Sequence, residues 1–259
     1  MARLRIDNLL IDRGLVETLD QAQRLIMAGQ VRAEGQVVLI PSEEFFNDIQ
    51  IDVDWGPRYV SRGGEKLSAA LNEFKVEVQG LICADVGAST GGFTDCLIQH
   101  GARKVYAIDV GRGVLHWKLR QDPKVVIMEG INVRYIDQLP EVVDLIAIDV
   151  SFISTKKIIP IVKPWLKDVT GKMIVLIKPQ FEASRSQSSK GKGVIKDPAI
   201  HKQVLFDVLN SARDNGFHID GLIQSPIKGP KGNKEFLVNL TLFEDQAVEV
   251  KKIVEALFP

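Results

Sequence analysis

Two charged residues, Asp149 and Lys178, each stand where a short apolar segment ends, and together they could move a proton. Asp149 follows the apolar run 145–148, and Lys178 follows the run 174–177. If both runs are strands of an open α/β sheet, their carboxyl ends face the ligand crevice, so the carboxylate and the amine should be neighbours. A lysine at the end of an apolar strand is partly desolvated, which favours its neutral form as a proton acceptor. A surface ion pair is the alternative interpretation of the same two residues.

A glycine-rich segment from Asp85 to Asp95 could hold a ligand. It follows an apolar run and opens a helical pattern, so its glycines would let the backbone come close to a bound molecule. It lacks the G-x-G-x-x-G spacing typical of dinucleotide pyrophosphate sites, whereas a methionine-derived cofactor needs backbone room for its amino-acid part. Asp109 ends the next apolar run, where Rossmann-type proteins bind ribose hydroxyls, although it fits either cofactor. Tight packing of strand against helix is the alternative explanation of the glycines.

The elements that must position these residues follow an α/β pattern from Leu81 onward. Short apolar strands alternate with amphipathic helical segments, which is typical of a mainly parallel sheet. The predicted strands are 81–86, 104–109, 125–128, 144–149, 172–178, 218–224 and 235–243. A segment rich in Pro, Gly and Lys joins the last two, so we expect them to pair as an antiparallel hairpin at the sheet edge.

A smaller unit precedes the sheet. Residues 5–34 predict two short helices with apolar residues at helical spacing, separated by Gly14, with Thr18 or Asp20 as the cap of the second. A turn and a short hairpin are expected over residues 29–39, followed by an acidic stretch. Gly56-Pro57 ends the unit. The predicted organisation is a domain over 1–55, a linker over 56–60 and a domain over 61–259.

Composition limits the possible classes of protein. The 259 residues are 45% hydrophobic and 25% charged, as in a globular protein, and 33 basic residues balance 33 acidic ones. No global positive field therefore indicates a nucleic-acid partner, which must be sought in local clusters. Cys83 and Cys96 have neither metal-ligand nor disulfide spacing, so we expect no metal. The start lacks the apolar core of a signal peptide, and no apolar run reaches membrane-spanning length, so we expect a cytoplasmic protein without a membrane partner.

Several segments in order resemble the hemolysin-like, FtsJ-type 2′-O-ribose RNA methyltransferases of the TlyA family. The matching segments are 59–67 (YVSRGGEKL), 85–95 (DVGASTGGFTD), 106–111 (YAIDVG), 148–152 (IDVSF) and 176–182 (LIKPQFE). The resemblance covers most of residues 58–243. It implies a Rossmann-like class I methyltransferase fold with an antiparallel last strand. It also implies S-adenosylmethionine as cofactor and cytidine 2′-O-methylation in ribosomal RNA, perhaps on assembled subunits.

The N-terminal unit is similar to the S-four RNA-binding module of ribosomal and RNA-modifying proteins, a small α+β domain. The resemblance implies RNA contacts from basic residues, here Arg3, Arg5, Arg13 and Arg24. Thr18-Leu19 replaces the Ser-Arg pair expected in such a module. Acidic residues match the arginines of the unit one for one, so it has little net charge with which to neutralise phosphates.

In the family a Lys-Asp-Lys-Glu tetrad carries the chemistry, and it falls here on Lys66, Asp149, Lys178 and Glu235. A ribose 2′-hydroxyl is a poor nucleophile, so it needs a base within hydrogen-bond reach while the methyl donor is held in line. Lys178 is the expected base, and Lys66 is a second cation that favours its neutral form. Asp149 and Glu235 would orient the two amines. Without the resemblance, a solvated surface pair is the preferred interpretation of Lys66 and Glu235. By the same resemblance the cofactor contacts are Gly87, Ser89, Gly91, Gly92, Phe93, Asp109 and Asn132, although Asn132 reads equally well as a turn residue.

Three basic clusters flank the predicted site and would form a local positive groove for RNA. They are Arg58, Arg62 and Lys66; Arg185, Lys190, Lys192 and Lys196; and Lys228, Lys231 and Lys234. Three other classes remain open as alternatives. An NAD-dependent enzyme would use the same loop, but no hydride-transfer site is identifiable. A membrane-lysing hemolysin would need a membrane-active segment, and none is present. A noncatalytic RNA-binding or ribosome-assembly protein would not need the tetrad.

Overall fold

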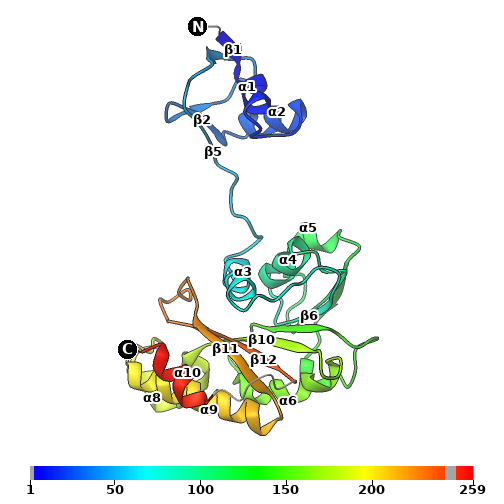
Figure 1. Ribbon diagram of the computed structural model, residues 1–259, viewed down its shortest axis with the longest axis vertical. Coiled ribbons are helices and arrows are strands. Elements are labelled where there is room, and N and C mark those ends of the chain that lie inside the picture. The colour runs from blue at the N-terminus through cyan, green and yellow to red at the C-terminus, as the bar shows by residue number, and fades with distance from the viewer. Residues whose placement is uncertain (1–2, 243–248, 259) are drawn as a thin grey trace. The chain divides into compact units, whose positions relative to one another are not determined.

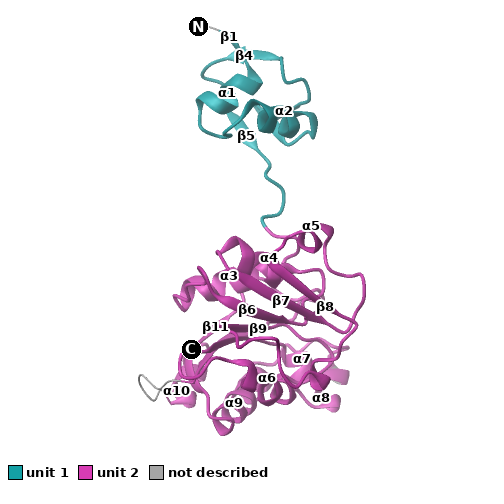
Figure 2. Ribbon diagram, turned by 90° about the vertical axis from the view of Figure 1, so that its right-hand side faces the viewer, with its two compact units in different colours: residues 1–58 teal, residues 59–259 magenta. Residues whose placement is uncertain are grey.

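The computed structural model describes residues 3–242 and 249–258, except for the side chain of Lys190. Its N-terminal part consists of short helices and strands. The chain divides into two compact units, residues 1–58 and 59–259 (Figure 2). The division lies between Arg58 and Tyr59, inside the segment that the sequence predicts as a linker.

The first unit has two helices and two small antiparallel sheets. Its elements are β1 (Arg3–Arg5), α1 (Ile6–Asp12), α2 (Leu19–Met27), β2 (Val31–Ala33), β3 (Gln36–Val38), β4 (Glu44–Phe46) and β5 (Ile51–Val53). The predicted hairpin is confirmed as β2–β3, and Thr18 is the cap of α2, since its side chain accepts from the Gln21 backbone N–H at 3.2 Å. Strands β4 and β5 lie in the acidic stretch, where no strand was predicted, because β1 and β2 supply backbone partners.

The second unit is built on a seven-stranded sheet in the order β11-β12-β10-β9-β6-β7-β8 (Figure 1). The strands are β6 (Ile82–Val86), β7 (Lys104–Asp109), β8 (Val125–Glu129), β9 (Leu145–Ile148), β10 (Lys172–Ile177), β11 (His218–Gln224) and β12 (Phe236–Thr241). Strand β12 runs antiparallel to both of its neighbours, β10 and the edge strand β11, and it pairs with β11 as predicted. The other pairings of the sheet are parallel. Phe243, the predicted end of the last strand, lies outside the described residues.

Helices cover both faces of this sheet, which is why its central strands are buried on both sides and read as apolar runs (Figure 1). One face packs against α3 (Gly63–Glu73) and α4 (Gly92–Gln99). The other packs against α6 (Ile159–Val162), α9 (Pro198–Asp214) and α10 (Val250–Ala256). The shorter helices are α5 (Trp117–Arg120), α7 (Pro179–Glu182), α8 (Arg185–Lys190), η1 (Val133–Tyr135), η2 (Thr155–Lys157) and η3 (Lys163–Trp165). None of the helices within the described ranges is long and apolar enough to cross a membrane.

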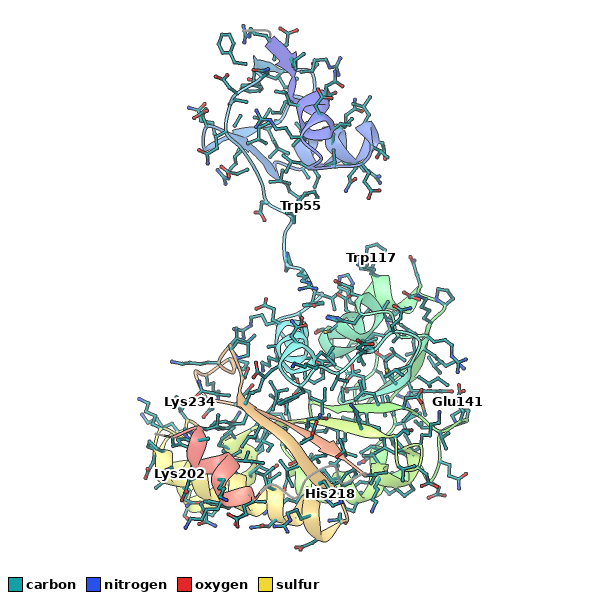
Figure 3. All side chains as sticks on the ribbon, in the orientation of Figure 1. Trp55, Trp117, Glu141, Lys202, His218 and Lys234 are labelled. Atoms are coloured by element: carbon teal, nitrogen blue, oxygen red, sulfur yellow. The ribbon has the colours of Figure 1, made fainter. Side chains whose placement is uncertain are left out.

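Ion pairs fasten the amino ends of the parallel strands. Lys104 begins β7, and its Nζ donates to Glu141 Oε1 at 2.5 Å. Glu141 is labelled in Figure 3. Lys167 Nζ lies 3.5 Å from Asp144 Oδ1, just before β10 and β9 begin. The carboxyl ends of the same strands lie at the opposite edge of the sheet, where the parallel arrangement gathers the residues that the sequence singles out.

Candidate active site

A cavity of about 580 Å³ lies at the carboxyl ends of β6, β9 and β10. Its walls come from the loop after β6, the first turns of α3 and α4, the segments after β9 and β10, and the segment before β12. The lining residues that matter to the chemistry are Arg62, Lys66, Gly87, Ser89, Gly92, Phe93, Asp149, Ser151, Phe152, Lys178, Gln180, Lys231 and Glu235. The four predicted catalytic residues thus share one cavity with four of the seven predicted cofactor contacts.

The four catalytic candidates form two ion pairs. Lys66 Nζ donates to Glu235 Oε2 at 2.5 Å, and the two side chains are 9% and 1% exposed. Lys178 Nζ lies 2.5 Å from Asp149 Oδ1, with the side chains 12% and 21% exposed. The pair of Lys66 and Glu235 is buried rather than solvated, and the pair of Lys178 and Asp149 is partly buried at the cavity wall. Gln180 lies between them, since its Nε2 is 3.5 Å from Glu235 Oε1 and it follows Lys178 by two residues.

Ser151 is a further partner of Lys178, beside Asp149. Lys178 Nζ donates to Ser151 Oγ at 3.1 Å while it also pairs with Asp149. Sequence reasoning assigned roles to neither Ser151 nor Gln180, although both lie inside the family-like segments. Which side chains of such a segment reach the lysine depends on loop geometry after the strand, and a linear pattern does not contain that geometry.

Two glycines allow close packing at the start of α3, the helix that carries Lys66: Gly64 leaves room for the Tyr59 ring, and Gly92 leaves room for the first turn of α3. A Cβ on Gly64 would lie 2.2 Å from the Tyr59 ring, and one on Gly92 would lie 2.3 Å from Ser61 Oγ and 2.9 Å from the Gly64 backbone nitrogen. Neither ring nor backbone could give way by that much. Gly92 therefore both packs against the start of α3 and lines the cavity.

The predicted cofactor loop turns sharply at Gly87 and Gly91. Gly87 has φ +89°, and a Cβ there would lie 2.5 Å from the Asp149 carbonyl oxygen. Gly91 has φ +97° and does not line the cavity, because it faces Leu119 and Leu115 behind the loop. Ser89 also has a positive φ, +50°, which a serine adopts only at some cost.

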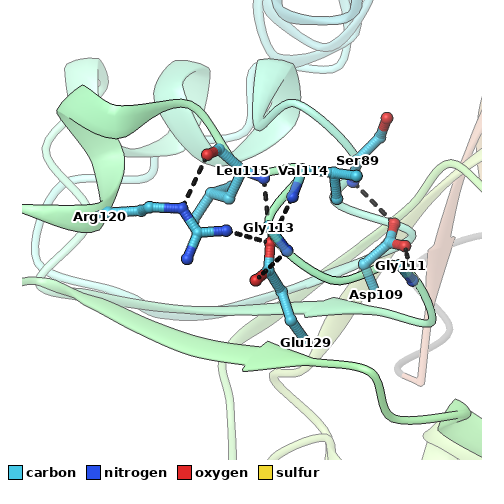
Figure 4. Close-up of polar contacts among 8 residues, drawn as sticks. All are labelled: Ser89, Asp109, Gly111, Gly113, Val114, Leu115, Arg120 and Glu129. Carbon is cyan, nitrogen blue, oxygen red and sulfur yellow. Dashed lines mark hydrogen bonds and ion pairs between the residues drawn. The ribbon is translucent and has the colours of Figure 1, made fainter.

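Asp109 and Asn132 do not line this cavity. Asp109 Oδ2 accepts from the Ser89 backbone N–H at 2.8 Å and Oδ1 accepts from Gly111 N–H at 2.7 Å, so this carboxylate ties the glycine loop to the end of β7 (Figure 4). Asn132 Oδ1 accepts from the Arg134 backbone N–H at 3.1 Å and thereby caps η1, which is a turn role. Their contacts with a cofactor stay predictions.

Burial raises the pKa of Asp85 to about 7, although the Thr94 hydroxyl donates to its Oδ2 at 2.6 Å. The residue is completely buried in β6, directly before the glycine loop, and its Oδ1 has no hydrogen-bond partner among the described residues. Asp149 and Asp109 add to the effect, because nearby negative charges disfavour ionisation. In the sequence, Asp85 is only the first residue of the glycine-rich segment, and no pattern there indicates that its carboxyl group is buried.

Contacts inside the N-terminal unit engage its four predicted RNA-binding arginines. Arg3 donates to the Glu44 carbonyl at 2.8 Å, and Arg5 donates twice to Asp7, at 3.0 and 2.6 Å. Arg13 donates to two backbone carbonyls of the segment 47–49, and Arg24 pairs with Asp20 at 2.5 Å. Their side chains thus hold the unit together, and any RNA contact would be made in addition to these bonds.

The basic clusters of the second unit reach the cavity in part. Arg62 and Lys231, from the first and third clusters, line it directly. Arg185 begins α8 and Lys192 follows that helix, but neither lines the cavity, and the side chain of Lys190 lies outside the described part of the chain.

An exposed aromatic residue, Phe152, lines the cavity together with Lys178 and Asp149. Its side chain is 91% exposed although its backbone has φ +65°, which is costly for a bulky residue. Its ring centroid lies 5.1 Å from that of Phe181, which also lines the cavity. Both residues lie within family-like segments of the sequence, but neither was predicted to have a role. An exposed phenylalanine cannot be distinguished from a core phenylalanine by its residue type alone.

Comparisons with known proteins agree with this architecture. Residues 59–242 match the FtsJ-like methyltransferase family, and residues 4–45 match the S4 domain. The chain is 46% identical over 240 residues to the Bacillus subtilis protein YqxC, covering 91% of this chain and 85% of that protein. It is 39% identical over 261 residues to the 16S/23S rRNA (cytidine-2′-O)-methyltransferase TlyA of Mycobacterium tuberculosis, covering 98% and 96%.

A solved structure of a hemolysin-named protein from Streptococcus thermophilus has the same architecture. It is 42% identical, with a TM-score of 0.72, over 99% of this chain and 96% of that one. The prediction of an N-terminal S4-type module followed along the chain by a Rossmann-like methyltransferase fold is confirmed. The chain therefore belongs to the TlyA family of FtsJ-like methyltransferases.

Proposed function

We propose that this chain transfers the methyl group of S-adenosylmethionine to a ribose 2′-hydroxyl of ribosomal RNA, with a cytidine as the target nucleotide. The observation that carries the proposal is the pairing of Lys178 with Asp149, and of Lys66 with Glu235, in one cavity beside a glycine loop. The name of the M. tuberculosis relative supports the ribosomal RNA and the cytidine. The cytoplasm, where ribosomal RNA is found, is the proposed compartment.

The residues of the glycine loop fit S-adenosylmethionine. Gly87 and Gly92 both line the cavity with backbone alone, and Gly92 is the first residue of helix α4, so the amino end of that helix lies at the cavity wall. The N-terminus of such a helix favours a carboxylate like that of the methionine part. We infer that Gly87, Ser89, Gly92 and Phe93 hold that part, and that the side of the loop near Asp109 holds the nucleoside. When bound, this cofactor supplies an electrophilic methyl group on a positively charged sulfur.

Lys178 is the proposed base. A neutral amine has two N–H bonds and one lone pair; here Nζ donates a hydrogen bond to Ser151 Oγ at 3.1 Å, and the Asp149 carboxylate is its ionic partner, 2.5 Å away. The lone pair is then free for the proton of a ribose 2′-hydroxyl, which becomes nucleophilic as the proton leaves. Asp149 holds the amine in place and stabilises the ammonium that forms.

Lys66 and Glu235 form the second, more deeply buried pair. Its charge is balanced within the pair, so it can hold a hydroxyl or phosphate oxygen of the nucleotide without a large net charge in the cavity. Gln180, two residues after Lys178, donates to Glu235 Oε1 at 3.5 Å. We infer that this pair positions the ribose rather than moves a proton.

The rim of the cavity suits single-stranded RNA. Arg62 and Lys231 can neutralise phosphates, and the exposed ring of Phe152 offers a face on which an unpaired base can stack. A nucleotide splayed out of its helix would then place its ribose toward Lys178. We propose free ribosomal RNA or a ribosomal subunit as the partner, with the N-terminal S4 domain as a further contact.

The test is methyl transfer to ribosomal RNA from cells that lack the gene. The purified chain and S-adenosylmethionine with a labelled methyl group should label that RNA, and RNA from wild-type cells should take up little label. A 2′-O-methyl group removes the hydroxyl that attacks the neighbouring phosphodiester in alkali, so the labelled nucleotide should resist alkaline hydrolysis. Label on a base, or no label in RNA, would refute the proposal.

A further inference from the structure

Glu129, the last residue of β8, holds a backbone loop and an arginine at once (Figure 4). Its carboxylate accepts from the N–H groups of Gly113, Val114 and Leu115 at 2.9, 3.0 and 3.0 Å. The Arg120 guanidinium also donates to it, at 2.5 Å. One side chain thus fixes three consecutive amides, which is more than a surface ion pair needs.

The carboxylate is charged under all ordinary conditions. Its side chain is 13% exposed, and the hydrogen bond from Arg120, aided by those from the backbone, lowers the pKa of Glu129 to about 2. Hydrogen bonds to an ionised acceptor are roughly twice as strong as neutral ones. The loop 113–115 is therefore held by an anion rather than by a neutral acceptor.

The loop held by Glu129 supports the glycine loop from behind. The His116 backbone N–H donates to the Thr90 carbonyl at 3.1 Å. The Leu115 and Leu119 side chains pack so closely on Gly91 that a Cβ there would lie 2.9 and 2.2 Å from them. Thr90 lines the cavity, so Glu129 is connected to the cavity wall by an unbroken series of contacts.

The other end of this loop is fixed in the same way. Asp109, the register partner of Glu129, accepts from Ser89 N–H and Gly111 N–H. The Gly130 backbone N–H donates to the Gly111 carbonyl at 2.8 Å. The two carboxylates at the ends of β7 and β8 thus hold one loop between them, and Asp109 alone reaches the glycine loop directly.

We propose that Glu129 is a positioning residue for cofactor binding: it holds the loop 111–116 so that the glycine loop keeps the shape that receives S-adenosylmethionine. It touches neither the cavity nor the proposed base. The inference rests on the proposed function, because it takes the glycine loop as the cofactor site. It predicts that loss of the carboxylate weakens cofactor binding and leaves the transfer step intact.

The test compares Glu129→Gln with Glu141→Gln in the full chain. Glu141 is a matched control, because its Oε1 also accepts from a cation, Lys104 at 2.5 Å, and from a second group, the Tyr106 hydroxyl at 2.9 Å. Lys104 begins β7, whereas Asp109, the partner of Glu129, ends it. Both variants lose one charge and one ion pair, but only Glu129→Gln loses them beside the glycine loop.

For Glu129→Gln we expect the KM for S-adenosylmethionine to rise at least about tenfold, as loss of one hydrogen bond to a charged group implies, with kcat changed less than about twofold. In the ligand-free protein, the amides of Gly113, Val114 and Leu115 should exchange hydrogen faster, as should those of residues 89–91. Glu141→Gln should change none of these quantities. Arg120→Gln, which removes one of four donors, should change them in the same direction by less, and it replaces Glu129→Gln if that variant does not fold.

Unchanged amide exchange, an unchanged KM, or an equal rise in both Glu variants would overturn the inference. Failure of the wild-type protein to methylate RNA would refute the proposed function instead. In that case amide exchange still decides whether Glu129 orders the glycine loop, because it is measured without cofactor or RNA.

Discussion

Replacement of Lys178 tests whether its amine moves a proton. The Nζ lies 2.5 Å from Asp149 Oδ1 and 3.1 Å from Ser151 Oγ, so Lys178→Ala removes the base and frees both partners. Loss of a general base usually costs about a hundredfold or more in rate, which is about 2.7 kcal/mol at 1.36 kcal/mol per factor of ten. Asp149 keeps 21% of its side chain exposed, so water can solvate it and the fold should lose little stability.

The assay is single-turnover methyl transfer to ribosomal RNA, together with calorimetry of cofactor binding. Lys167→Ala is the control, because Lys167 pairs with Asp144 before the same two strands begin, at the opposite edge of the sheet. We expect Lys178→Ala to reduce transfer at least about a hundredfold with unchanged cofactor affinity. Lys167→Ala should transfer methyl groups at the wild-type rate.

Lys178→Arg separates the base from a simple cation. A guanidinium keeps the charge but does not give up its proton near neutral pH, so this variant should fail almost as badly as Lys178→Ala. An active Arg variant would show that the positive charge alone suffices. Near-normal transfer by Lys178→Ala, with an unchanged melting temperature, would refute the assignment of Lys178 to the reaction.

Four further predictions concern the same unit. Calorimetry should detect binding of S-adenosylmethionine or its demethylated product and not of NAD, and the reverse order would contradict the cofactor assignment. Glu235→Gln leaves the Lys66 amine buried without its carboxylate and should destabilise the fold by about 3 kcal/mol in denaturant titrations, whereas the double change Lys66→Met with Glu235→Leu should cost less. Asp85→Asn should flatten the pH dependence of unfolding: the raised pKa of Asp85 means that its contribution is fully present below about pH 4 and is lost as the pH rises through about 7, so an unaltered profile would count against it. Gly91→Ala should lower the melting temperature and weaken cofactor binding, because its Cβ would overlap Leu119, and wild-type behaviour would show that the loop adapts freely.

The alternation of apolar runs and amphipathic segments determined the fold of the second unit. Strands β7 and β11 begin and end where the sequence predicted, and the edge hairpin follows from the absence of a helical segment between its strands. A strand that is buried on both faces must be apolar along its length. Such a strand can therefore be recognised from neighbouring residues in the sequence. Strands β4 and β5 were missed because the acidic stretch lacks such a pattern and is held by backbone bonds to partners distant in the sequence.

The sequence also indicated that Asp149 and Lys178 would meet, because parallel strands end at one edge of the sheet. It did not indicate that Lys66 and Glu235, which are 169 residues apart, would form the more buried pair; without the family resemblance they read as surface residues. Lys66 lies on α3, whose first turn packs directly against Gly92 at the start of α4, and this contact is a fact of packing. No pattern of residue types records such a close approach.

Tertiary structure alone decided the partners of the polar groups. Asp109 reads as a ribose ligand in the sequence, yet its oxygens hold Ser89 and Gly111, while Glu129, unremarkable in the sequence, holds the loop behind the glycines. The physical reason is one of range. Burial and periodicity act between residues close along the chain, so a sequence displays them, whereas a carboxylate bonds whichever donors the folded chain brings within 3 Å, and only the complete fold determines which these are.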